Sequence, residues 1–201
     1  ILFRMRESYE PYEWSYKETL GELVAHRNNL AVGVFILDGI QGTALLLIWP
    51  LLVFLILGQS YLSLGVVLSV TLLSAFLGRH LVRSFLTRLR ADTPYVLATI
   101  AFSSWIFRLA AGTPVHIVIA DIYYHSGARP RESGIDAHAG DQWADNGHYV
   151  DEYTALKEMG FAMGRIALCM LFAALAVTFV PLVAFFVAIT ITAIAAAVSV
   201  L

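Results

Sequence analysis

The chain has 201 residues and a net charge of −2; 59% of its residues are hydrophobic and 14% are charged. Soluble domains carry about 25% charged residues, so this composition excludes an ordinary soluble domain and indicates an integral membrane protein. The small net charge gives no argument for a nucleic-acid partner, and the single cysteine, Cys169, excludes a disulfide within the chain. Because the sequence lacks a starting Met and stops inside an apolar run, we expect it to be a segment of a longer protein.

Residues 1–29 precede the first long apolar stretch. Their sequence ESYEPYEWSYKETLGELVAHR mixes acidic, aromatic and basic side chains. This pattern is typical of an amphipathic segment that lies at the cytoplasmic membrane surface and leads into a first span.

Six apolar stretches follow, each long enough or nearly long enough to cross a bilayer as a helix of about 20 residues. The expected spans are 30–57, 61–77, 95–111, 114–126, 158–180 and 181–201. The fourth gives the weakest signal, because its apolar core is short and holds His116 and Asp121. The sequence therefore predicts an all-α membrane protein with a six-helix transmembrane domain over residues 30–201.

Lys and Arg are concentrated in the connections 1–27, 78–92 and 127–157, which hold all but Arg108 and Arg165 of the 13 basic residues. Basic residues in loops accumulate on the cytoplasmic side of a membrane. This bias places both ends of the segment in the cytoplasm, which requires an even number of spans. We expect the chain to be integral to the cell membrane, the inner or plasma membrane.

Ionisable residues inside a span cost at least about 2.5–3.5 kcal/mol and are candidates for functional sites. Asp38 lies about 12 Å past Leu30, and Gln41 follows three residues later on nearly the same helix face. These two residues either form a polar patch facing a cavity or make a hydrogen bond between helices through a protonated Asp38.

Asp121 is expected near mid-depth of the fourth span, either lining a cavity or buried between helices. His116 and His125 are nine residues apart, so they point to opposite sides of a helix and do not form a metal site with Asp121. Arg108 lies within one turn of the end of the third span, where its side chain is expected to snorkel to the membrane surface.

Glu158 and Arg165 are seven residues apart on one face of the fifth span, about 10.5 Å along the axis, too far for a direct pair. Arg165 is the deeper charge and has no neutral form, so it needs a counter-charge, an anionic ligand or water. Asp38 and Asp121 are the candidate counter-charges. Gly160 and Gly164 form a Gly-x-x-x-Gly step, which predicts close packing on a neighbouring helix.

The loop 127–157 is polar and holds ligand types suited to a metal, at His138, Asp141, Asp145 and His148. These residues have no recognised ligand spacing, so we expect a solvated cytoplasmic loop and predict no metal and no cofactor. The chain also lacks the Gly-x-Ser-x-Gly, His-Glu-x-x-His and phosphate-binding glycine motifs. We therefore do not expect an enzyme.

Two stretches resemble a known family. YEPYEWSYKETLGELVAHRNNLAVGVFILDGIQGT is similar to the passage from the central cytoplasmic loop into the seventh helix of major facilitator superfamily transporters. DEYTALKEMGFAMGRI is similar to the start of the eleventh helix in some bacterial members. The number of spans and the long loops also resemble the C-terminal six-helix half of this family, and the resemblance covers essentially the whole chain.

This family often carries a Gly-x-x-x-Asp-Arg motif between the second and third helices of such a half. Here GRHLVRSFLTR supplies Gly78 and Arg83, but Val82 stands at the position of the Asp. The resemblance implies a cytoplasmic gate in which a basic residue of this segment meets Glu158. The gate candidates are Gly78, Arg79, Arg83, Arg88 and Glu158.

The resemblance implies a bundle of two inverted three-helix repeats, with spans one, two, four and five lining a central cavity. That ranks four residues as candidates for the substrate or coupling cavity, and it leaves Arg108 outside. The candidates are Asp38, Gln41, Asp121 and Arg165. The implied function is secondary transport of a small solute by alternating access, with Asp38 or Asp121 coupling transport to protons.

Transport would also need an N-terminal six-helix half that is not part of this chain. The alternative is a non-transporting membrane scaffold or assembly module, in which the buried charges only hold helices together.

Overall fold

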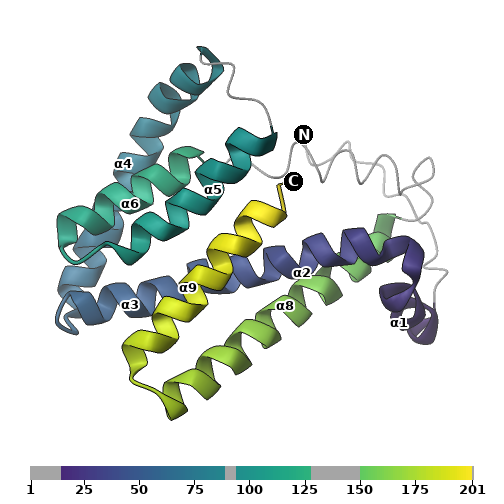
Figure 1. Ribbon diagram of the computed structural model, residues 1–201. Helices are drawn as coiled ribbons and strands as arrows, with labels where there is room; N and C mark the ends of the chain where they lie inside the picture. Colours follow the sequence, from purple (N-terminus) through teal and green to yellow (C-terminus); the bar gives the residue numbers. More distant parts are fainter. Residues whose placement is uncertain (1–14, 89–93, 128–149, 201) are drawn as a thin grey trace, which may run out of the picture.

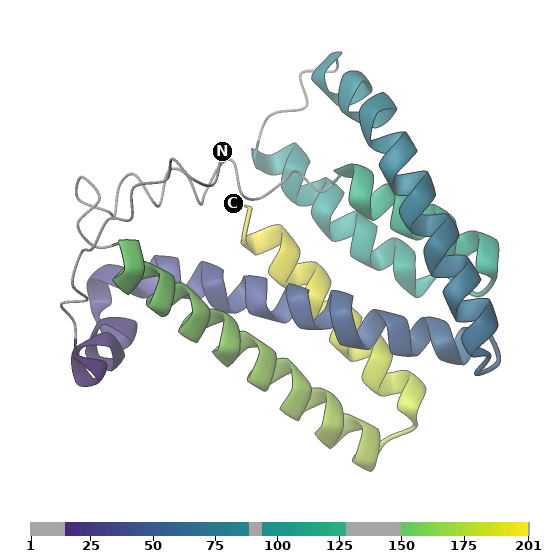
Figure 2. The same ribbon diagram turned by 180° about the vertical axis from the view of Figure 1, so that it is seen from behind.

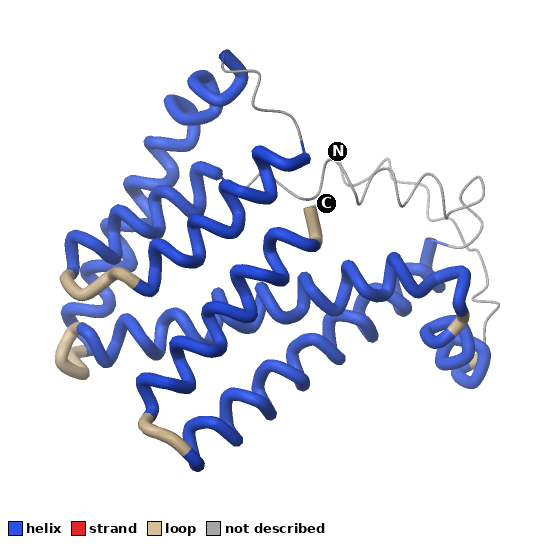
Figure 3. Tube along the Cα trace, viewed as in Figure 1, coloured by secondary structure: helices blue, strands red, loops and turns tan. Residues whose placement is uncertain are grey.

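The computed structural model describes residues 15–88, 94–127 and 150–200, and every regular element in these ranges is a helix (Figures 1 and 3). The elements are α1 (Tyr16–Val24), η2 (His26–Asn28), α2 (Asn29–Thr43), η3 (Ala44–Ile48), α3 (Trp49–Ile56), α4 (Tyr61–Arg88), α5 (Pro94–Leu109), α6 (Pro114–Gly127), α8 (Val150–Thr178) and α9 (Pro181–Val198).

Helix α1 begins at a capping box in the segment before the first apolar stretch. Ser15 accepts a hydrogen bond from the backbone N–H of Glu18, and the Glu18 carboxylate accepts one from the backbone N–H of Ser15. Such reciprocal bonds satisfy two amide groups that the first turn of a helix leaves without partners. They also hold the pKa of Glu18 below its ordinary value, because both bonds favour the ionised carboxylate.

The first expected span is a single helical rod made of α2, η3 and α3. Between the two α-helical parts, Ala44–Ile48 forms a wider, π-helical turn, in which the N–H of Trp49 bonds to the carbonyl of Ala44. Pro50 follows directly. Proline has no N–H to donate, and its ring collides with the carbonyl four residues earlier, so a locally widened turn is the expected response of the helix.

Two helices extend beyond the apolar stretches that predicted them. Helix α4 continues to Arg88 through the segment expected to be a loop, because 78–88 contains no proline and is rich in Leu and Arg, which favour helix. Helix α8 begins at Val150 rather than at Glu158. Its first turn contains Asp151 and Glu152, and acidic residues favour a helix N-terminus.

Three helical segments of the described residues are long and apolar enough to cross a membrane: Asn29–Ile56, Tyr153–Thr178 and Pro181–Val198. The stretches Tyr61–Ser74 and Tyr95–Leu109 are apolar but shorter. The structure is thus all-helical, with the long apolar helices of a membrane protein.

The helices pack in a few main pairs. Helices α2 and α8 lie side by side and run in the same direction (Figures 1 and 2). Helix α9 packs on α2, on α8 and on α5, and α6 packs on both α4 and α5. Helix α9 therefore joins the α2–α8 pair to the group formed by α4, α5 and α6.

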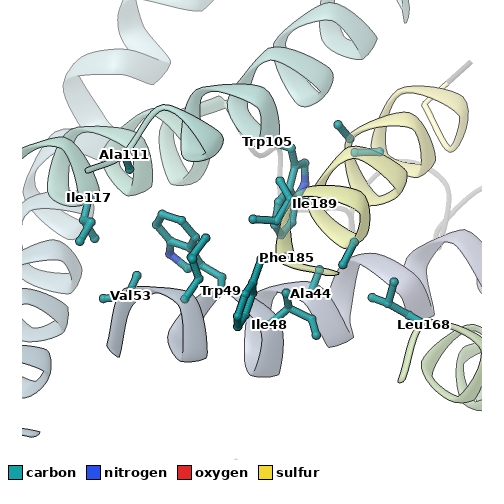
Figure 4. Close-up of a cluster of buried hydrophobic side chains, with 14 of the residues drawn as sticks. Ala44, Ile48, Trp49, Val53, Trp105, Ala111, Ile117, Leu168, Phe185 and Ile189 are labelled. Atoms are coloured by element: carbon teal, nitrogen blue, oxygen red, sulfur yellow. The ribbon is translucent and has the colours of Figure 1, made fainter. Parts of the chain in front are cut away.

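The apolar core lies where these groups meet. Figure 4 shows Trp49 and Ile48 of the first rod, Trp105 of α5, and Phe185 and Ile189 of α9 in this core. Both Trp side chains are almost fully buried. The large aromatic side chains of three separate helices thus fix how α9 and α5 sit on the first rod.

Candidate functional site

Arg108 of α5 and Asp121 of α6 form a buried ion pair. Their exposed fractions are 0% and 3%, and Nη2 of Arg108 donates to Oδ1 of Asp121 at 2.7 Å. A bond of this length between ionised groups is a charge-assisted hydrogen bond. The pair joins the two helices on either side of the turn at residues 110–113.

Three aromatic rings surround the guanidinium. The Cζ atom of Arg108 lies 4.1 Å from the centre of the Tyr124 ring, 4.4 Å from Trp105 and 4.9 Å from Trp49. We call these three residues the aromatic cage. Cation–π contacts contribute most when they are shielded from water, as they are around Arg108. The cage draws on α3, α5 and α6, so the buried charge ties the first rod to the α5–α6 pair.

Most of the hydrogen-bonding capacity of the site is not used within the described residues. The Nε and Nη1 atoms of Arg108 have no acceptor there, and neither do the indole nitrogens of Trp49 and Trp105. Asp121 is therefore the one hydrogen-bond partner of the guanidinium among the described side chains. The positive charge depends on that carboxylate and on the π faces of the cage.

The expectation that Arg108 snorkels to the membrane surface is wrong. Side chains on an α-helix tilt toward its N-terminus, so Arg108 points back along α5, away from the turn at 110–113. Asp121 lies seven residues after Pro114, about 10.5 Å into α6. In an antiparallel pair, that depth is where a long side chain tilted back from position 108 ends.

This pairing also changes the interpretation of Asp121. It lies against α5 and is almost fully buried, so it does not line an open cavity, and its partner is Arg108 rather than Arg165. Its neighbour on the helix, Tyr124, belongs to the cage, while Tyr123 contacts the hydroxyl of Ser103 at 2.8 Å. The polar face of α6 is thus directed at α5.

Asp38 and Gln41 lie together on α2, as their spacing indicated. The buried side chain of Gln41 donates to Oδ1 of Asp38 at 3.4 Å, to the carbonyl of Leu37 at 3.3 Å and to the hydroxyl of Ser199 at 3.1 Å. Gln41 therefore links α2 to the end of α9, and Asp38 is half-buried beside it.

Glycines bring α2 and α8 close together. A Cβ atom at Gly160 would lie 2.7 Å from the Cβ of Phe35, and one at Gly164 would collide with the backbone of Ile36. On the other helix, a Cβ at Gly39 would collide with the backbone of Phe161. The Gly-x-x-x-Gly step of α8 thus lies where the two backbones approach most closely. We call this contact the glycine seam.

Glu158 and Arg165 are both exposed on α8. The guanidinium of Arg165 lies 5.9 Å from the ring of Phe161, and no ion pair to either residue is formed within the part of the chain that the structure describes. In the apolar segment Tyr153–Thr178, Arg165 is the central charge. Exposure of a charge at that depth to lipid costs at least about 2.5–3.5 kcal/mol.

The gate candidates fall partly outside the described side chains. Gly78, Arg79, Arg83 and Arg88 lie on the last turns of α4, but only their backbone is described, so contacts with Glu158 stay a prediction. His138, Asp141, Asp145 and His148 lie outside the described residues. Among the described ranges, no group of three potential metal ligands is present.

The aromatic cage was not predicted from the sequence, although the sequence contains a signal for it. Trp105 precedes Arg108 by three residues, and Tyr124 follows Asp121 by three. On a helix, such spacing places each aromatic ring on the same face as its charge. No known protein family, curated protein or solved structure matches the chain.

Proposed function

We propose that the chain is one six-helix half of a secondary transporter that moves a small solute by alternating access. A second six-helix unit would cover the open side of α8, and the solute would pass between the two units. The proposal belongs with the resemblance to the major facilitator superfamily and rests on the arrangement of helices and on one charge.

The order of packing supports two three-helix repeats. Exchanging the first rod, α4 and α5 with α6, α8 and α9 turns the α2–α8 contact into the α6–α4 contact. It turns the α2–α9 contact into the α6–α5 contact and leaves α5–α9 unchanged, and all these contacts are present. The α8–α9 contact has no counterpart of similar extent between α4 and α5. Three-helix repeats that follow one another must be inverted, because each span reverses the direction of the chain.

Arg165 is the observation that carries the proposal. Only 17% of the most apolar window of its helix is buried, against 44% in each of the other two long apolar helices. An exposed, permanently charged side chain in the middle of such a helix needs protein or water against it rather than lipid. A water-filled path between two half-bundles is the arrangement that transporters use.

The structure narrows the four cavity candidates. Asp121 is turned toward α5 and Gln41 toward α9, where each has a partner. Arg165 and Asp38 remain on surfaces that this chain leaves at least partly open. We therefore propose Asp38 as the carboxylate that couples transport to protons, and the Arg108–Asp121 pair as a support that holds α5 and α6 to the first rod.

The test is solute flux in proteoliposomes that contain the full-length protein and an internal pH-sensitive dye. A panel of small carboxylates, phosphates, sugars and amines is added outside. Solute-dependent pH changes that require the protein support proton-coupled transport, and their loss in Asp38→Asn supports the role of Asp38. If radiolabelled solutes of all four classes fail to enter with folded protein, the transport proposal is wrong.

A membrane scaffold is the second candidate function. The observation that favours it is the Arg108–Asp121 pair, which is buried between helices and holds three elements together without facing an open surface. A scaffold would show a stable complex with another membrane protein and no flux of any solute in the same assay.

A further inference from the structure

We propose that Arg165 binds the carboxylate or phosphate group of a small anionic solute in a water-filled cavity beside the glycine seam. This inference rests on the proposed function and names the class of substrate. It begins from the depth of Arg165 in its helix. Arg165 is twelve residues from Tyr153 and thirteen from Thr178, about 18 and about 20 Å from the two ends.

At this depth, Arg165 cannot reach either membrane surface. Snorkelling serves long side chains near the ends of a span, and the middle of a 26-residue helix is beyond that reach. The side chain is nevertheless exposed, with the ring of Phe161 as its nearest described aromatic neighbour. The surface that it occupies is therefore not a lipid-facing surface in the assembled protein.

The exposed part of α8 is divided into two faces. At 100° per residue, one sector carries only large apolar side chains. These are Met163, Ile166, Met170 and Val177, all well exposed. The adjoining sector carries small or polar residues. These are Glu158, Ala162, Arg165, Cys169 and Ala173. The first sector has the composition of a lipid-facing surface, and the second, which we call the polar face, does not.

The polar face lies on the same side of the glycine seam as Asp38. Asp38 precedes Gly39 by one residue, and Arg165 follows Gly164 by one. Both glycines are at the contact, and α2 and α8 run in the same direction (Figures 1 and 2). In parallel helices, opposite offsets of about 100° from facing positions turn to the same flank. Two helices therefore contribute charge to one flank.

Other charges on this flank leave Arg165 as the anion-binding group. Asp38 accepts a hydrogen bond from Gln41. Lys157 lies two turns before Arg165, 5.6 Å from the Phe161 ring, and Glu158 is next to it, so their charges are close to each other near the start of the span. At the centre of the span, the guanidinium is the one charge on α8. Its planar fork of donors matches carboxylate and phosphate groups.

Cys169, one turn beyond Arg165 on the polar face, serves as a reporter. The experiment measures how fast a membrane-impermeant, cationic thiosulfonate modifies Cys169 in the full-length protein, with any cysteine outside this chain replaced. Succinate, lactate and inorganic phosphate are added separately at constant ionic strength, with glycerol as a neutral probe. We expect at least one anion to slow the modification, and glycerol not to. The comparison of carboxylates with phosphate identifies the group that binds.

Variants at Arg165 show whether the guanidinium is responsible. In Arg165→Gln the anion concentration for half protection rises by about tenfold or more, because a charge-assisted hydrogen bond is lost, and Arg165→Lys retains part of the protection. Protection by the same anion in Arg165→Gln, or no protection by any of the three, overturns the proposal. Flux of uncharged solutes without anion protection refutes the anion site alone. Anion protection without flux of any solute refutes transport alone.

Discussion

Replacing Asp121 by Asn is expected to destabilise the protein strongly, although the two side chains are nearly the same size. The change removes the negative charge opposite Arg108. The guanidinium is fully buried, and Asp121 provides its one hydrogen bond among the described residues. Breaking a buried ion pair in this way costs about 3–5 kcal/mol, because the remaining charge has no partner.

The converse change should cost less. In Arg108→Met, Asp121 can bind a proton and become neutral, and a methionine sulfur packs well against the rings of the cage. We therefore expect a loss of about 1–3 kcal/mol, the cost of leaving one buried polar group without its partner. In the double variant, the Asn at position 121 should add less than about 1 kcal/mol, since no buried charge is left.

The measurement is the free energy of unfolding in mixed detergent micelles as the denaturing detergent is increased. Arg165→Met is the matched control, because it removes the same type of side chain from an exposed position, and we expect a change within about 0.5 kcal/mol. Polar contacts between membrane helices average only about 0.6 kcal/mol. If Asp121→Asn costs no more than that, or if the two single changes simply add, the buried pair does not have the role assigned to it.

Two further predictions concern the glycine seam and the first helix. Gly39→Ala should destabilise by about 1–3 kcal/mol, since its Cβ would collide with the backbone of Phe161, whereas Gly33→Ala, on the same helix with open space around it, should not, and thermal unfolding of the two variants checks this. Because the folded-state pKa of Glu18 is below its ordinary value of 4.5, the capping box should stabilise α1 at neutral pH and lose this effect as the pH falls through the folded-state pKa. Amide exchange in α1, compared with Ser15→Ala and Glu18→Gln at each pH, should differ at pH 7 and converge below about pH 4; equal exchange at pH 7 would refute it.

The sequence was informative where a pattern is local. Apolar runs predicted long helices such as Asn29–Ile56, and the Gly160–Gly164 spacing indicated a place where α8 could pack closely, which is where α2 lies. Helix ends were less accurate, because hydropathy detects the apolar stretch and not the helix. Polar turns with good helix formers extend α4 to Arg88 and start α8 at Val150.

The buried pair could not be derived from hydropathy, because it depends on which way a side chain points. Position 108 suggested a surface charge, and only the backward tilt of side chains on α5, together with the antiparallel α6, brings Arg108 to Asp121. Trp49 completes the cage from a distant part of the chain. No spacing within either helix predicts a contact between residues 49 and 108.

The most direct test of the proposed aqueous path compares two neighbouring positions on α8. In membrane vesicles, the native Cys169 of the full-length protein should react with a membrane-impermeant thiosulfonate. A cysteine at the next position, in Cys169→Ala/Met170→Cys, should not react, because Met170 lies on the large apolar sector. Reaction at position 170 without reaction at Cys169 would place lipid against Arg165 and contradict the account.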